Sequence, residues 1–274
     1  MRALLVLILA LTAQAAAALP ERLADTGLDE ARSLAFTPQY PLWSDGTAKR
    51  RWLALPPGAS IDATRPDAWQ FPAGTKAWKE FSYGGRKIET RFIERTAAGA
   101  WRFAAYVWNA EGTEARLAPA EGATLPVADA PGGRYAVPSR TDCLACHEGA
   151  PVPILGFSAL QLAADLSRFS KVLKNLSGEA PRIPVASPET RAALGYLHAN
   201  CGHCHNDSGP LAGLGLVLSQ PAAGAAPADP TVLLARMQHR NPLLRMPPLG
   251  VRVPHAEGAA LVARWIAFHK ESHP

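Results

Sequence analysis

The chain is poor in sulfur and in runs of one charge. Its 274 residues include only 4 cysteines and 3 methionines, and its longest basic run is the triplet Lys49 to Arg51. A net charge of +5 without a basic stripe excludes an extended nucleic-acid surface, and we expect the triplet to be a solvated surface patch. No Ser-His-Asp arrangement or phosphate-binding loop is visible, and the carboxylates are scattered. The sequence therefore indicates no obvious substrate site.

The N-terminus predicts export from the cytoplasm. Arg2 precedes an apolar run from Ala3 to Leu11, and small residues occupy positions 16 to 18. This order is typical of a secretory signal peptide, which we assign to residues 1–18, and it indicates a periplasmic protein. The run is short for a membrane-spanning helix, although an uncleaved anchor is the alternative. After removal of the signal we expect no integral membrane span.

All four cysteines lie in two copies of one pattern. "CLACH" contains Cys143, Cys146 and His147, and "CGHCH" contains Cys201, Cys204 and His205. A zinc site, a dithiol redox motif, a disulfide framework and covalent haem attachment can all use such cysteines. A zinc ribbon places its second cysteine pair about 15 to 20 residues after the first, whereas 54 residues separate Cys146 from Cys201. A dithiol motif explains neither the following histidine nor the second copy.

Covalent haem attachment explains both copies. Two thiols three positions apart on a helical turn can each bond one haem vinyl group, and the adjacent imidazole can then reach the iron. The sequence thus predicts two covalently attached haem c groups. Their thioethers would be formed by Cys143 with Cys146 and by Cys201 with Cys204, and their iron ligands would be His147 and His205. An exported chain would then have no thiol left to form a disulfide.

A methionine is the expected second ligand of the C-terminal haem. Only two methionines follow the signal peptide. Met237 lies in a predicted amphipathic helix, where packing in the core is the usual role. Met246 precedes Pro247 and Pro248 in a rigid loop after the second motif, which suits an axial ligand. We therefore assign Met246 to the second haem iron.

The second ligand of the first haem stays open. No methionine lies between His147 and Met237, so its iron is bound by two histidines, by a histidine and a weaker group, or by one histidine alone. His203, between the cysteines of its motif, is expected to face outward. Two arginines close to iron ligands in sequence can pair with haem propionates or with solvent. The candidates are His198, His239 and His255 for the iron, and Arg140 and Arg245 for the propionates.

The N-terminal part, residues 19–135, has the pattern of an antiparallel β-module, either a sandwich or a barrel. "KAWKEFSY" and "RKIETRFIE" flank Gly84-Gly85, which predicts a hairpin, and "WRFAAYVW" alternates apolar residues on one face. The tryptophans of this region are expected in the core or on strand faces. Residues 118–133 have no clear periodicity and predict a loop or linker.

The rest of the chain predicts helices, so the expected fold class is α+β. Residues 136–186 form the first haem-binding segment, and helical spacing in "ILGFSALQLAADLSRFSKVLKNL" predicts a helix after the motif. Residues 187–274 form an all-α domain: Ser187 is the expected N-cap of a helix that runs into Cys201, and further helices start at Pro230 and near Pro254.

The motifs of residues 187–274 resemble a class I cytochrome c domain. The segments concerned are "YLHANCGHCH", "RMPPLG" and "GAALVARWIAFH". The resemblance implies that Met246 is the distal ligand and that Trp265 packs the last helix against the first. The whole chain is also similar to a family of periplasmic haem proteins, in which a β-rich front half containing "PLWSDG" precedes "SRTDCLACH" and a C-terminal cytochrome.

These features favour a periplasmic di-haem cytochrome that passes single electrons between redox protein partners, rather than an enzyme. One alternative is a di-haem peroxidase-like enzyme with an open site at the N-terminal haem. Another is a cytochrome that its β-module docks onto a partner oxidoreductase. The sequence predicts neither the reduction potentials nor the oligomeric state.

Overall fold

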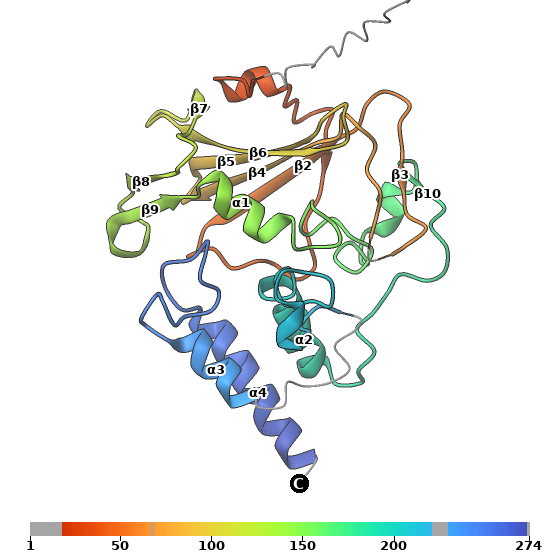
Figure 1. Ribbon diagram of the computed structural model, residues 1–274, viewed down its shortest axis with the longest axis vertical. Helices are drawn as coiled ribbons and strands as arrows, with labels where there is room; N and C mark the ends of the chain where they lie inside the picture. The colour runs from red at the N-terminus through yellow and green to blue at the C-terminus, as the bar shows by residue number, and fades with distance from the viewer. Residues whose placement is uncertain (1–17, 67, 221–229, 273–274) are drawn as a thin grey trace, which may run out of the picture.

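The computed structural model describes residues 18–66, 68–220 and 230–272 (Figure 1). It has an α+β fold in which an N-terminal antiparallel sheet of six strands precedes a C-terminal region with four helices. The predicted α+β class and antiparallel β-module are confirmed. The predicted signal peptide lies, apart from residue 18, outside the described residues.

The main sheet has the strand order β1-β2-β4-β5-β6-β7, and every neighbouring pair is antiparallel. β1 and β7 are its edge strands, so the module is built on one open sheet, and the predicted sandwich or barrel is wrong. Two small two-stranded sheets accompany it, β8 with β9 and the parallel pair β3 with β10. The strands are β1 (Leu34–Ala35), β2 (Ala48–Ala54), β3 (Ile61–Asp62), β4 (Lys76–Tyr83), β5 (Arg86–Arg95), β6 (Trp101–Trp108), β7 (Ala115–Leu117), β8 (Ala123–Pro126), β9 (Arg134–Val137) and β10 (Leu173–Lys174).

The β4–β5 hairpin turns at the predicted glycines. Gly84 and Gly85 have φ values of 53° and 84°, which glycine adopts without the steric cost of a side chain. Alternation along the strands then gives the sheet two apolar faces. The N-terminal segment covers one face, where Trp78 donates a hydrogen bond from Nε1 to Oγ1 of Thr26 at 2.9 Å. The predicted core role of the tryptophans holds for Trp52, Trp69 and Trp78, which are buried.

The other face of the sheet is covered by the first motif and the chain that follows it. Helix α1 (Arg140–His147) lies over β6, and residues 152–173 supply buried apolar side chains such as Phe157 and Leu162 (Figure 1). The predicted helix in residues 154–176 is wrong, because this segment forms only a 3₁₀ turn, Leu166–Phe169, and strand β10. Its apolar residues pack against the sheet from an irregular chain, so tertiary packing overrides the helical spacing. The predicted loop 118–133 likewise contains β8.

The remaining helices pack around a second core. They are α2 (Pro188–Asn200), α3 (Pro230–Gln238) and α4 (Ala256–Ser272). Ser187 caps α2 as predicted, accepting a hydrogen bond from the backbone N of Thr190 at 3.2 Å. Met237 and Trp265 are both buried between these helices, so the predicted core role of Met237 is confirmed. Across residues 18–66, 68–220 and 230–272, none of the helices combines the length and apolar character needed to cross a membrane.

Candidate cofactor site

Helix α1 presents the first Cys-x-x-Cys-His motif to the sheet. A capping box fixes its start: Ser139 accepts a hydrogen bond from the backbone N of Asp142 at 3.0 Å, and the Asp142 carboxylate accepts one from the backbone N of Ser139 at 2.9 Å. The helix ends at His147, whose ring lies 5.2 Å from that of Phe103 on β6. Cys143 is buried, and burial raises the pKa of its thiol to about 11. The motif is therefore held on a rigid element next to the sheet.

His147 has the arrangement of a metal-ligating histidine. Its Nδ1 lies 2.6 Å from the carbonyl oxygen of Pro153. A carbonyl can only accept, so Nδ1 carries the proton and Nε2 keeps its lone pair. Burial lowers the pKa of the ring to about 3, with the Pro153 hydrogen bond acting in the opposite direction. A neutral imidazole oriented through its other nitrogen is the usual state of a histidine that binds a metal ion.

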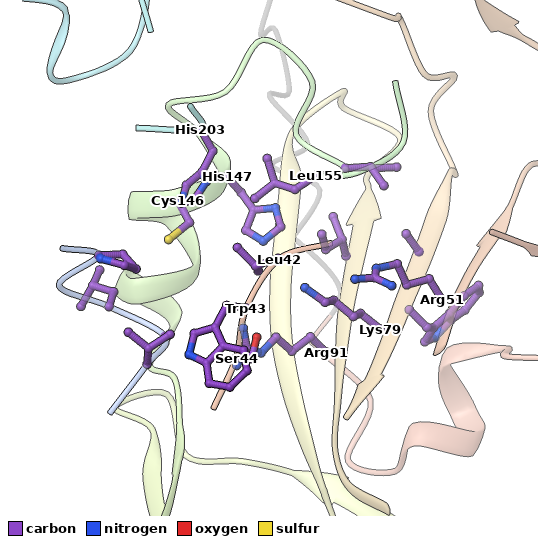
Figure 2. Close-up of a pocket in the computed structure, with 18 of the residues that line it drawn as sticks. Leu42, Trp43, Ser44, Arg51, Lys79, Arg91, Cys146, His147, Leu155 and His203 are labelled. Atoms are coloured by element: carbon purple, nitrogen blue, oxygen red, sulfur yellow. The ribbon is translucent and has the colours of Figure 1, made fainter. Parts of the chain in front are cut away.

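A cavity adjoins His147 on the sheet side (Figure 2). Cys146 and His147 border it from α1, and basic residues of β2, β4 and β5 border it from the sheet. Leu42, Trp43 and Leu155 contribute apolar walls. The basic residues are Arg51, Lys79 and Arg91.

The second motif starts at the end of α2, where Cys201 is the C-cap residue. Burial raises the pKa of its thiol to about 12. Cys201, Met246 and Met237 border a second cavity, so the structure brings the predicted ligand Met246 to the second motif. His205 does not border that cavity. Its Nδ1 is buried and finds no hydrogen-bond partner in the described part of the chain.

The two motifs touch each other. The ligand atoms of Cys146, His203 and Cys204 lie within 4.8 Å of one another. The Cys204 thiol is also 3.8 Å from the carbonyl oxygen of Ala145. Asn206 joins the loops through a 2.9 Å hydrogen bond from Nδ2 to the carbonyl oxygen of Gly149. His203 therefore contacts the other motif, and the prediction that it faces outward is wrong.

The thiols of Cys146 and Cys204 share a hydrogen bond across the two motifs. This bond, followed by burial, raises the pKa of Cys146 to about 12. The same bond lowers the pKa of Cys204, against the effect of burial. Because Cys146 and Cys204 are far apart in sequence, the motif spacing did not predict this contact.

The other predicted iron and propionate ligands are engaged elsewhere or exposed. Nδ1 of His198 accepts a hydrogen bond from the backbone N of Gln220 at 3.0 Å, and His255 stacks on Trp43 with ring centroids 3.9 Å apart. Arg245 donates to the carbonyl oxygens of Arg252 and Val251. Half-buried His239 accepts a hydrogen bond from the backbone N of Asn241 at 3.1 Å, and Arg140 is exposed. Of the three candidate histidines, none borders the His147 cavity as described.

Comparison of this chain with protein-family models, with curated proteins and with solved structures finds no match.

Proposed function

We propose that the protein is a periplasmic cytochrome that carries two covalent haem c groups and transfers single electrons between redox protein partners. The observation that carries the proposal is the geometry of the first motif. Two thiols precede His147 at the required spacing, and the Pro153 carbonyl leaves Nε2 as the free ring nitrogen. Haem bound at both motifs would supply one-electron chemistry between ferric and ferrous iron.

The donor atoms present at both motifs fit haem c. The thiols of Cys143 and Cys146 would hold the first group, and those of Cys201 and Cys204 the second. The Nδ1 of His205 has no carbonyl partner of the kind that orients His147, so the ligand role of His205 rests on its place directly after Cys204 in the motif. Met246, beside Cys201, would complete the second site. The helices α2 to α4 would then form the class I cytochrome c domain.

The contact between the motifs supports electron transfer within one chain. The Asn206 side chain fixes one loop against the other by donating to the carbonyl oxygens of Gly149 and Gly202, and both Asn206 and Gly149 are buried. Burial, followed by the nearby charges of Lys79 and Arg91, lowers the pKa of His147 and keeps its imidazole neutral. The residues of this chain would thus bind, orient and shield the redox groups.

A second candidate is a metal site. Cys146, His203 and Cys204 offer two sulfurs and one nitrogen within 4.8 Å, a donor set that suits zinc or copper. The two candidates exclude each other, because a cysteine sulfur bonded to a haem vinyl group is no longer a thiolate.

Mass spectrometry and metal analysis of the chain matured in a host that attaches haem c separate the candidates. The haem proposal expects the mass of two haem groups and iron at two per chain. One zinc or copper ion per chain with no added haem mass would contradict the haem proposal and support the metal site.

A further inference from the structure

The sheet face beside His147 carries a row of like charges. Arg51 on β2 pairs in register with Lys79 on β4, and Lys79 pairs with Arg91 on β5. We call Arg51, Lys79 and Arg91 the cationic row. Residues directly opposite across strands have Cβ atoms about 5 Å apart, so like charges at these positions repel. Figure 2 shows the row on the sheet side of the cavity, facing the His147 ring.

The first two members of the row have no anion next to them. Arg51 is 7% exposed, and neither Arg51 nor Lys79 has an ion-pair or hydrogen-bond partner among residues 18–66, 68–220 and 230–272. Lys79 Nζ lies over the Phe81 ring, 5.0 Å from its centroid. Burial, followed by repulsion from Arg51 and Arg91, lowers the pKa of Lys79 well below its ordinary value. An unpaired charge in such surroundings is costly unless something neutralises it.

The neighbouring charged groups do not supply the missing anion. Glu89 already accepts hydrogen bonds from Arg91 at 2.9 Å and from the Tyr135 hydroxyl at 2.6 Å. Asp45 accepts from the backbone N of Arg252 at 2.9 Å. Lys49, two residues before Arg51 on the same face of β2, adds a further positive charge. The cavity therefore faces an excess of positive charge, with a guanidinium group whose fork suits a carboxylate.

We propose that the cationic row is an anion site that receives carboxylate groups of the ligand held at His147. This inference rests on the proposed function, on which those carboxylates are the propionates of the first haem. It replaces the expectation that Arg140 and Arg245 pair with propionates, since the first is exposed and the second donates to backbone carbonyls. A small free oxyanion has the same chemistry and is the second possible source.

The test compares Arg51→Gln with Arg50→Gln in the full chain. Arg50 is the next residue on β2 but lies on the opposite face, where it pairs with Glu30 and Glu80. Both variants lose one positive charge, and only the first is in the cationic row. The potentials of the two haems are measured against pH, and the propionate bands are recorded by resonance Raman spectroscopy. Thermal unfolding with added sulfate probes a free anion.

Propionates in the row predict that one of the two potentials is independent of pH between about pH 5 and pH 8 in the natural protein. Arg51→Gln should lower that potential, shift the propionate bands and introduce a slope approaching about 59 mV per pH unit, the value for one proton per electron. Arg50→Gln should do none of these. A free anion in the row instead predicts that sulfate raises the Tm of the natural protein and of Arg50→Gln by more than it raises the Tm of Arg51→Gln, which keeps only the general stabilisation by sulfate.

Equal behaviour of Arg51→Gln and Arg50→Gln in all three measurements would overturn the anion site. Arg51→Lys, which keeps the charge, guards against misfolding and should retain most of the natural behaviour. If the chain carries no haem by mass, the proposed function fails, and the sulfate measurement alone decides the row. A rise in Tm with sulfate that is smaller only in Arg51→Gln would then support the anion site, and equal rises in all three proteins would overturn it.

Discussion

Acidification should destabilise the haem-free chain, because His147 and His198 bind protons more weakly in the folded chain than in the unfolded one. Burial lowers the pKa of His147 to about 3 and that of His198 to about 4, from 6.5 in an unfolded chain. Protons therefore bind the unfolded state first as pH falls below 6.5, and stability is lost until the folded pKa values are reached. At about pH 4.5, two pH units of unfolded-state titration at about 1.4 kcal/mol each remove about 2.5 kcal/mol per histidine, or about 5 kcal/mol together.

Urea unfolding of the haem-free chain at about pH 7.5 and about pH 4.5 measures this loss. His198→Gln should recover about half of it, since a glutamine oxygen can still accept the hydrogen bond from the backbone N of Gln220 and cannot be protonated in this range. His239→Gln is the matched control, because half-buried His239 also accepts a backbone hydrogen bond, from the N of Asn241 at 3.1 Å, which a glutamine oxygen can still accept. An acid loss that is unchanged in His198→Gln, or no loss in the natural chain, would refute the reasoning.

Three further outcomes follow from the packing and the proposed ligands. Met246→Ala should lower the potential of one haem and abolish the near-infrared sulfur-to-iron band. Met237→Ala, in the helical core, should keep the band and lower the free energy of unfolding in urea by about 2 to 5 kcal/mol. The reverse pattern would show that Met237 is the ligand and Met246 the core residue. Trp265→Ala should destabilise the C-terminal helices by about 3 to 5 kcal/mol, and a loss under about 1 kcal/mol would contradict the buried position of its ring. Electron paramagnetic resonance of the oxidised protein should show two inequivalent haems, of which the first lacks methionine; cyanide binding with peroxide turnover would favour the peroxidase alternative, and two equivalent Met/His signals would contradict the assignment.

Local rules predicted the elements with strong local signals. The Gly84-Gly85 hairpin, the Ser187 cap of α2 and the start of α3 at Pro230 each depend on a few adjacent residues, and each is present. The helix expected after the first motif failed because Phe157 and Leu162 pack on the sheet from an irregular segment. Periodicity alone cannot distinguish these two uses of apolar residues.

The site shows a similar division. The spacing of the cysteines and histidines could be read directly, whereas the contact between Cys146 and Cys204 depends on how two distant loops pack. The triplet Lys49 to Arg51 was expected to be solvated, but strand alternation turns Lys49 and Arg51 toward the cavity side and leaves Arg50 on the other face. Arg51, Lys79 and Arg91 lie on three different strands. Their proximity follows from the register of the sheet, which the sequence alone does not give.

The number of covalent haem groups tests the central proposal most directly. Intact mass spectrometry of the chain matured with haem attachment should give the polypeptide mass plus two haem groups. The double variant Cys201→Ala, Cys204→Ala should retain one, because Cys143 and Cys146 lie on a different helix with its own cap. A natural chain that gains no haem mass would contradict the account.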